Sequence, residues 1–361
     1  MSIDTNKVQD EEVGSTPGVR SLEHAQLPRY AVPALLVGSL VVVGAILGLT
    51  GSFSIGLFVF LAAALFAVAT YLTSRFVEGR RKATDRLVTV VVTSAFLIAL
   101  APLISVVVTV VGNGLARFDV EFFTSSMRGV VGEGGGGYHA IMGTLIITTL
   151  AAVMSIPVGL LAAIYLVEYG TGRLARAITF FVDVMTGIPS IVAGLFAFAL
   201  FAIFFGPGVR MGFGGAVALS VLMIPVVVRA TEEMLKIVPN ELREAAYALG
   251  TPKWRTIVKV VLPTSIAGIA SGITLAIARV VGETAPLLII AGLTTALNLN
   301  PFDGRMATLP VFAYYSYAAP GVPREPYLDR AWTAALVLII IVLALNLLAR
   351  LIARFFAPKT R

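Results

Sequence analysis

The chain has 361 residues, of which 58% are hydrophobic and 13% charged, and it contains no cysteine. Because soluble proteins carry about a quarter charged residues, this composition excludes a water-soluble globular protein, and the missing cysteines exclude disulfides and cysteine-ligated metal sites. In a membrane protein, the net charge of +7 indicates orientation across the bilayer rather than nucleic-acid binding.

The N-terminal part predicts a tail followed by an apolar hairpin. Residues 1–29 are polar and carry both signs of charge, so we expect a disordered cytoplasmic tail rather than a signal peptide. No charge occurs between Ala31 and Ser74, a stretch far too long for one membrane crossing. A turn at Thr50-Gly51-Ser52 divides it, which predicts a transmembrane hairpin over 30–74.

Six further apolar stretches bring the expected number of transmembrane helices to about eight, in an all-α polytopic bundle. They cover residues 87–111, 140–167, 177–205, 213–229, 264–293 and 331–351. With eight spans, 20 of the 27 Lys and Arg residues fall on the side that holds both termini and the loop 229–262, and six on the other. Cytoplasmic loops are enriched in Lys and Arg, so both termini and this loop should face the cytoplasm.

Two loops are expected on the outer side. Gly132, Gly134 and Gly137 match G-x-G-x-x-G, but no strand precedes them, so a flexible glycine loop is expected rather than a nucleotide site. Residues 294–330 contain five prolines and several aromatic residues. This segment should pack against the spans.

Two charged residues lie near the ends of predicted spans. Asp183 lies early in the span 177–205, before a kink expected over 187–190. It either gates or pairs with a basic residue such as Arg229, or it lies at the membrane interface, which we favour slightly. Arg229 ends the span 213–229 after a break expected at Pro225. From its position in the sequence alone, Arg229 is favoured as a cytoplasmic anchor over a substrate ligand.

The loop 241–263, ELREAAYALGTPKWRTIVKVVLP, is polar but patterned as two helices. Asn240 is expected to cap the first helix, whose apolar stripe is Leu242, Ala245, Ala246 and Leu249. Gly250 should end that helix in a left-handed conformation, Thr251 should cap a second helix, and Pro252 should occupy its first turn. The segment is either a solvated helical hairpin or a surface that docks on another protein. We favour the docking surface.

The segment ARVVGETAPLL, residues 278–288, places Arg279 and Glu283 four residues apart in the span 264–293. This spacing predicts an ion pair on one helix face, and charges at bilayer depth usually line a water-filled path. An arginine fork suits a tetrahedral oxyanion. The pair either serves conduction, which we favour, or only fixes the helix in the bundle.

The order of residues in the loop resembles the coupling-loop signature of ABC-importer permeases. The matching positions are Glu244, Ala245, Ala246, Gly250, Val260, Leu262 and Pro263. Segments 143–170, 188–196, 224–254 and 275–292 are similar to one family among them, PstA, the phosphate-importer permeases. ARVVGETAPLL is the most specific of these matches.

The resemblance implies a MetI-like type-1 permease core over 140–351, with residues 87–139 as its first span and outer loop and 352–361 as a cytoplasmic tail. The hairpin 30–74 exceeds the usual six spans. Arg279, Glu283 and Arg229 would belong to the substrate path. Glu244, Ala245, Ala246, Gly250, Leu262 and Pro263 would couple the permease to its ATPase.

The implied partners are a dimer of a PstB-like ATPase, a second, PstC-like permease, an outer PstS-like phosphate-binding protein and membrane lipid. No G-x-x-x-x-G-K-[ST] sequence occurs, so the chain itself is expected to be neither an ATPase nor another enzyme. No cofactor is expected. Three alternatives stay open: a permease for sulfate or molybdate, a membrane subunit that acts mainly in phosphate sensing, and a stand-alone ion-coupled carrier.

Overall fold

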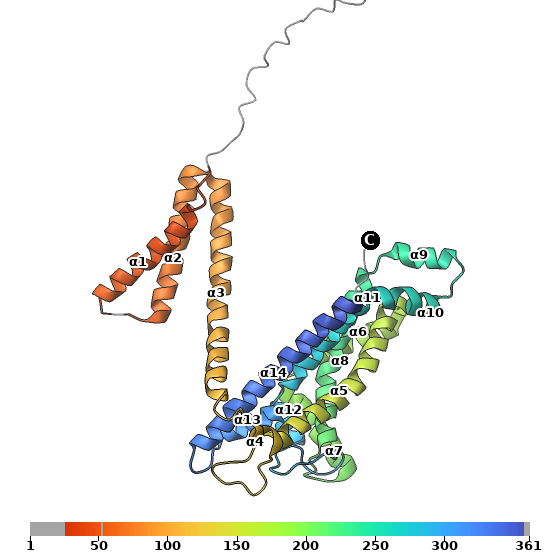
Figure 1. Cartoon of the computed structure of the whole chain (residues 1–361). Helices are drawn as coiled ribbons and strands as arrows, with labels where there is room; N and C mark the ends of the chain where they lie inside the picture. The colour runs from red at the N-terminus through yellow and green to blue at the C-terminus, as the bar shows by residue number, and fades with distance from the viewer. Residues whose placement is uncertain (1–25, 52, 357–361) are drawn as a thin grey trace, which may run out of the picture. The chain divides into compact units, whose positions relative to one another are not determined.

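The computed structural model describes residues 26–51 and 53–356, and these contain helices and no strands (Figure 1). The chain divides into two compact units, Met1–Ser105 and Val106–Arg361. Within the described residues, seven helices are long and apolar enough to cross a membrane, and a bent helix pair brings the total to at most eight. The all-α, multi-pass prediction is therefore confirmed.

The first unit contains the predicted hairpin. Helix α1 (Ala31–Leu49) packs against α2 (Ile55–Val77), and Gly51 between them has a φ of +64°. Glycine adopts this left-handed conformation at no steric cost, which explains the turn. The long helix α3 (Arg80–Gly114) follows and contains the predicted span 87–111. Most of the predicted tail 1–29 lies outside the described residues.

The turn from α2 to α3 is organised around Glu78. Its buried carboxylate accepts hydrogen bonds from Ser74 Oγ at 2.7 Å, from Leu27 N at 2.9 Å and from Arg86 Nε at 2.6 Å. Burial acts to raise the pKa of Glu78, but the bonds from Arg86, Leu27 and Ser74 outweigh it and lower the pKa to about 2. One carboxylate thus joins both helices to the segment before α1.

The second unit is built on four long helices: α5 (Tyr138–Ile164), α8 (Gly212–Ile237), α11 (Leu262–Val281) and α14 (Glu325–Phe356). Helix α5 packs along α8, α8 along α11, and α11 along α14 (Figure 1). Shorter elements complete the unit: α4 (Val120–Thr124), η1 (Tyr165–Tyr169), α6 (Gly172–Thr186), α7 (Ser190–Phe205), α9 (Asn240–Ala248), α10 (Lys253–Thr256), η2 (Ile257–Val261), α12 (Ala285–Ile290) and α13 (Leu309–Ala318).

The four-helix core depends on close backbone approach. Helices in a membrane gain stability mainly from tight packing, which small residues permit. A Cβ at Gly143 would lie 1.9 Å from the Ala307 carbonyl oxygen, and one at Gly159 would lie 2.7 Å from Val227 Cγ1. Any side chain at either position would force the neighbouring segment away from α5. Around these contacts Ile147 and Met223 are fully buried.

The predicted span 177–205 is not one helix. Helices α6 and α7 meet at an angle of 109°. The break is at Gly187, Ile188 and Pro189, where a kink was expected. Proline disfavours helical geometry in the residue before it, and here it ends α6 at Thr186 altogether.

The expected break at Pro225 was also wrong. Helix α8 runs without interruption from Gly212 to Ile237, and Pro225 is buried inside it. Arg229 therefore lies about two turns before the helix end and does not terminate it. In contrast, the predicted span 264–293 is divided, because α11 ends at Val281 and α12 begins at Ala285.

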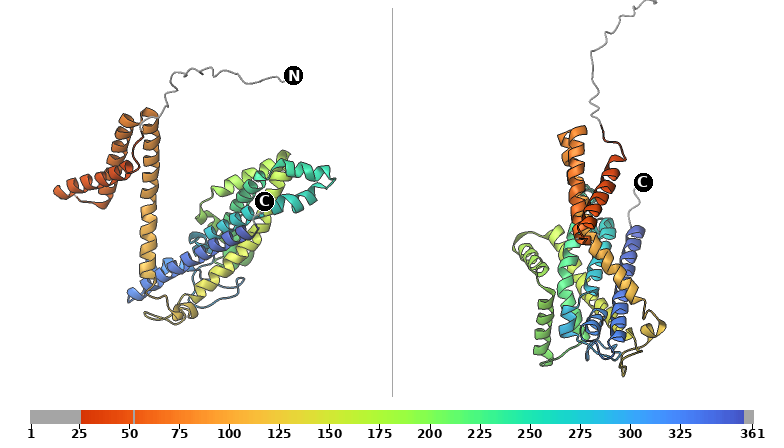
Figure 2. Two further views of the ribbon diagram at one scale, coloured as in Figure 1. Left: turned by 45° about the horizontal axis from the view of Figure 1, so that its top comes forward. Right: turned by 90° about the vertical axis from the view of Figure 1, so that its left-hand side faces the viewer.

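The segment 294–330 packs on the bundle, as predicted. Met306, Leu309 and Phe312 are buried, and the last two share a cluster with Phe122 of α4. Helices α9 and α10 lie at one end of the second unit, near the end of α14, whereas α4, α13 and the connection from α7 to α8 lie at the other (Figures 1 and 2). We call these the α9 end and the α4 end.

Candidate coupling surface and charged path

Helix α9 ends in the conformation that the sequence predicts. Gly250 has a φ of +73°, its N–H donates to the Tyr247 carbonyl at 2.9 Å, and the N–H of Thr251 donates to the Ala246 carbonyl at 3.2 Å. This pair of bonds is the Schellman motif, which needs a left-handed residue where glycine fits best. The predicted helix stop at Gly250 is therefore confirmed.

The predicted caps were wrong by one residue. Helix α9 begins at Asn240 itself, after Pro239, and the Asn240 side chain accepts a bond from Arg243 instead of capping the helix. The hydroxyl of Thr251 donates back to the Ala246 carbonyl, and Pro252 takes the cap position of α10. The backbone N–H and the hydroxyl of Thr251 thus both stabilise the end of α9, and α10 has no side-chain cap.

The second half of the loop belongs to a long helix rather than to a separate one. From Lys253 the chain stays helical to Val281 through α10, η2 and α11. Leu262 and Pro263 open α11, directly after the wider turn of η2. Proline removes one backbone hydrogen bond of a regular α-helix, and η2 is a single π-helical turn, which is the usual form of the π-helix inside α-helices.

Most of the predicted docking stripe is exposed. Leu249 is 86% exposed, Leu242 and Ala245 are exposed, and Ala246 is buried. Glu244 and Trp254, outside the stripe, are exposed as well. We call the five exposed residues the coupling surface. Large apolar side chains clustered on a polar loop indicate a contact with another protein.

Arg243, for which the sequence indicates no role, fixes α9 to the bundle. Its guanidinium donates to Glu168 Oε1 at 2.9 and 3.1 Å and to the carbonyls of Leu235 and Val238 at 3.0 and 2.6 Å. Glu168 lies in η1, at the end of α5, and the two carbonyls end α8. Nearby, Lys253 Nζ lies 4.8 Å from the centre of the Tyr169 ring.

Arg229 is engaged by two carboxylates. It donates to Asp183 of α6 and, at 2.7 Å, to Glu232 Oε2 of its own helix, and Lys236 binds the other oxygen of Glu232 at 2.7 Å. The pairing of Asp183 with Arg229, which the sequence left as the less favoured alternative, is therefore observed. It ties α6 to α8.

The predicted ion pair between Arg279 and Glu283 is absent from the described residues. Arg279 is exposed on α11, whereas Glu283 is half-buried in the break between α11 and α12, where its N–H bonds the Val280 carbonyl. The two residues do not share one helix, because α11 ends before Gly282 and α12 begins at Ala285. Pro286 occupies the first turn of α12, where proline is tolerated, and disfavours helical geometry just before it. Neither side chain makes a hydrogen bond or ion pair within the described part of the chain.

Comparison with known proteins gives the family. The model of the binding-protein-dependent transport system inner membrane component matches residues 155–361. Phosphate transport system permease protein PstA 1 of Mycobacterium tuberculosis is 49% identical over 285 residues, which are 78% of this chain and 92% of the relative. The chain belongs to the PstA family of these permeases.

Other relatives agree with this assignment. PstA of Mycobacterium leprae is 46% identical over 288 residues, 78% of this chain and 92% of the relative. PstA of Yersinia pestis is 38% identical over 287 residues, 78% of this chain and 93% of the relative. A chain of a bacterial alginate ABC transporter, solved in complex with an alginate pentasaccharide-bound periplasmic protein, has a TM-score of 0.54 at 16% identity, over 77% of this chain and 96% of that one. This likeness shows the fold alone.

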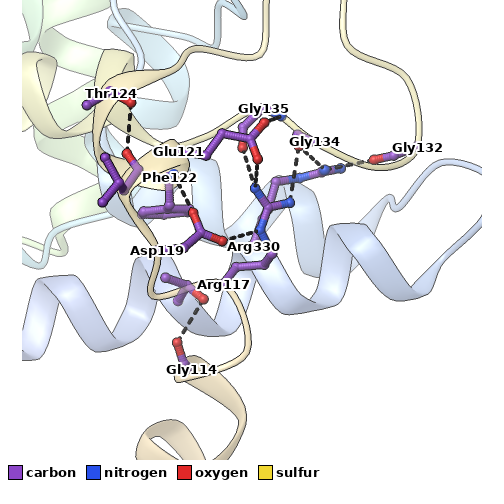
Figure 3. Close-up of polar contacts among 12 residues, drawn as sticks. Gly114, Arg117, Asp119, Glu121, Phe122, Thr124, Gly132, Gly134, Gly135 and Arg330 are labelled. Atoms are coloured by element: carbon purple, nitrogen blue, oxygen red, sulfur yellow. Dashed lines mark hydrogen bonds and ion pairs between the residues drawn. The ribbon is translucent and has the colours of Figure 1, made fainter.

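At the α4 end of this PstA-family chain, the glycine loop is held in place by arginines (Figure 3). Arg117 donates to Asp119 and Glu121, each at 3.0 Å, and to the Gly135 carbonyl at 2.9 Å, and Glu121 accepts the Gly135 N–H at 2.9 Å. The backbone bond from Phe122 and the contact with Arg117 outweigh desolvation and lower the pKa of Asp119. The expectation of a flexible loop was wrong.

Arg330 completes this network from α14. It is fully buried, donates from Nη1 to the carbonyls of Gly132 and Gly134 at 2.7 and 2.8 Å, and lies over the Tyr327 ring at 4.6 Å (Figure 3). Backbone carbonyls and an aromatic face replace a carboxylate partner. The network fastens the glycine loop to α14, and no local pattern in the sequence could have paired these distant residues.

Proposed function

We propose that this PstA-family permease carries inorganic phosphate across the membrane as one subunit of an ATP-driven importer. The relatives are named phosphate transport permeases, and the coupling surface supports the dependence on an outside energy source. Its partners would be a second permease, two ATPase subunits that bind the coupling surface, and an outer phosphate-binding protein. The chain itself would perform no covalent chemistry.

The α9 end faces the cytoplasm in this proposal, together with both termini. The distribution of Lys and Arg supports it, because 20 of the 27 fall on that side of the predicted topology. The α4 end then faces outward. The phosphate-binding protein would dock there, on the loops around α4 and α13.

The coupling surface is joined to the core in two ways, which supports its role in transmitting force. Helix α10 continues into α11 without a flexible joint, and Arg243 binds the ends of both α8 and η1. A rigid displacement of α9 and α10 by the ATPase would therefore move three core helices together. Such rigid-body motion of a packed element is a common basis of alternating access.

Arg279 is the residue of this chain best suited to meet phosphate during crossing. An arginine inside a membrane is costly unless it has a partner or water, and no group of the described residues binds its guanidinium. Its planar fork can donate two parallel bonds to an oxyanion. Glu283, in the break after α11, would balance its charge once phosphate has left.

Arg229 contributes to the path less directly. Two carboxylates already engage it, so it would have to release Asp183 to bind phosphate. We assign it a gating role, in which contact between α6 and α8 changes with access.

The test is phosphate uptake by the complete complex in proteoliposomes, with ATP hydrolysis measured in parallel. Arg279→Gln should abolish uptake while the ATPase subunits remain bound, and Arg128→Gln, a change of an exposed arginine, should leave uptake normal. Uptake that survives Arg279→Gln would argue for a sensing role instead. Displacement of labelled phosphate by an equal concentration of sulfate would argue for another oxyanion.

A further inference from the structure

Two arginines converge on Gly292 at the α4 end, from two loops distant in sequence. Arg210 precedes α8, and Arg305 lies between α12 and α13. A Cβ placed on Gly292 would lie 3.2 Å from Arg210 Cδ and 3.4 Å from Arg305 Cδ. The two Cδ atoms are thus no farther apart than these distances combined, so their guanidinium groups can reach one small ion.

The backbone holds both arginines in place. The N–H of Met211, next to Arg210, donates to the Ile290 carbonyl at 3.0 Å. The N–H of Met306, next to Arg305, donates to the adjacent Ala291 carbonyl at 3.1 Å. The two arginines therefore flank one short segment in a fixed register, which is unlike two side chains that meet by chance on mobile loops.

Side-chain and backbone contacts stiffen the loop of Arg305 further. Asn298 Nδ2 donates to the carbonyls of Asp303 and Arg305 at 2.8 and 3.0 Å. The N–H of Phe213 in α8 donates to the Pro301 carbonyl at 2.6 Å. The turn that carries Arg305 is thereby fastened to the helix that follows Arg210.

Neither guanidinium has a partner within the described residues. The other two arginines that interact at this end, Arg117 and Arg330, are bound by carboxylates or carbonyls. Two like charges held close together repel each other, and the side chain of Asp303 forms no ion pair with either of them. An anion from outside the chain would remove that repulsion.

We propose that Arg210 and Arg305 form an entry site for a tetrahedral oxyanion, which holds phosphate at the mouth of the permease before it reaches Arg279. This inference rests on the proposed function. Two arginine forks offer four or more donors toward one point, which matches the several oxygens of phosphate. Gly292 has a φ of +73°, a backbone conformation that favours glycine, and both arginine stems pack close to its backbone.

The alternative occupant is a carboxylate of the phosphate-binding protein. Loss of a docking contact would change the concentration of binding protein needed for half-maximal transport and leave the maximal rate of uptake unchanged. Loss of an ion site on the path would lower the maximal rate of uptake even when binding protein saturates the complex. The two readings therefore separate in one titration.

The experiment measures phosphate uptake by the complete complex in proteoliposomes over a range of binding-protein concentrations. Arg210→Gln with Arg305→Gln should lower the maximal uptake about tenfold or more, since each removes charge-assisted bonds to the ion. Arg128→Gln with Arg324→Gln is the matched control, because both residues are exposed and lie in other loops of the same end. It should keep wild-type uptake.

An unchanged maximal rate in the Arg210 and Arg305 double variant would overturn the site, and a changed half-maximal concentration alone would assign the arginines to docking and overturn it equally. If the double variant does not assemble, Arg305→Glu decides. Arg305 is exposed, so its reversal should not disturb folding, and normal uptake in that variant would also overturn the proposal. A wild-type complex that imports no phosphate at all would instead refute the proposed function.

Discussion

Arg243 and Glu168 are 75 residues apart in sequence, and the guanidinium of the first binds the carboxylate of the second with two hydrogen bonds. Only 13% of the Arg243 side chain and 5% of the Glu168 side chain are exposed. The remaining donors of Arg243 bind the last carbonyls of α8. One side chain therefore links α9 to the ends of two core helices.

Loss of this link should uncouple ATP hydrolysis from transport. Arg243→Ala leaves the buried Glu168 carboxylate without its partner, a change that typically costs about 3–5 kcal/mol. We expect uptake to fall strongly while the ATPase stays bound through the coupling surface. The measurement is the ratio of phosphate imported to ATP hydrolysed, with Lys259→Ala, a change of an exposed residue on η2, as the control.

A second variant separates coupling from simple instability. Replacing both partners by apolar residues, Arg243→Met with Glu168→Leu, leaves no buried charge unpaired. This chain should be more stable than the single variant yet still poorly coupled, because the bonds to α8 are lost. Normal coupling in the double variant would contradict the role of Arg243 in force transmission.

Gly250 offers a sharper test of the coupling helix. Its φ of +73° costs other residues about 1–2 kcal/mol, and a β-branched side chain tolerates it least. Gly250→Val should therefore displace α10 from α9 and abolish phosphate-stimulated ATPase activity. Gly250→Asn is the matched control, because asparagine is the next best residue at this position and should retain most activity.

Arg229 allows its two possible roles to be told apart. If it gates through the contact with Asp183, Asp183→Asn should alter uptake nearly as much as Arg229→Gln, and Arg229→Lys should keep part of the activity because it keeps the charge. If it binds phosphate with its fork, Arg229→Lys should fail as Arg229→Gln does, and Asp183→Asn should have little effect. The readout is initial uptake rate in proteoliposomes.

The sequence predicted most spans because apolar length is a local property. It predicted a kink near Pro189 and a break at Pro225, and only the first is observed, because the effect of a proline depends on tertiary packing. Pro225 is buried within α8 and the helix continues through it, whereas Pro189 follows Gly187 and ends α6 in a bend of 109°. Composition around the two positions does not distinguish these outcomes.

The candidate site was predictable only in part, for a related reason. Gly250 was found because a helix stop is encoded in neighbouring residues, and the exposed stripe was found from its spacing. Arg243 was not, since its partner lies 75 residues away. The expected pair of Arg279 with Glu283 failed because the spacing rule assumes one helix, and α11 ends at Val281.

The junction of α2 and α3 provides a test by pH. The pKa of Glu78 falls from 4.5 to about 2 in the folded chain, so its ionised form stabilises the fold. A depressed carboxylate pKa contributes fully above the unfolded value and is lost as pH falls through the folded one. This contribution should be intact at pH 5 and above and should decline between about pH 4.5 and pH 2.

The measurement is the apparent melting temperature of the purified chain in detergent between pH 6 and pH 3, compared with Glu78→Gln. At pH 6 the variant should melt lower, because Arg86 and the Leu27 N–H lose their ionised acceptor. The gap between the two proteins should shrink as pH falls, since the wild-type carboxylate becomes protonated. Glu133→Gln, a change of an exposed carboxylate in the glycine loop, should show no such convergence. A constant gap across this range would contradict the assignment of the pH effect to Glu78.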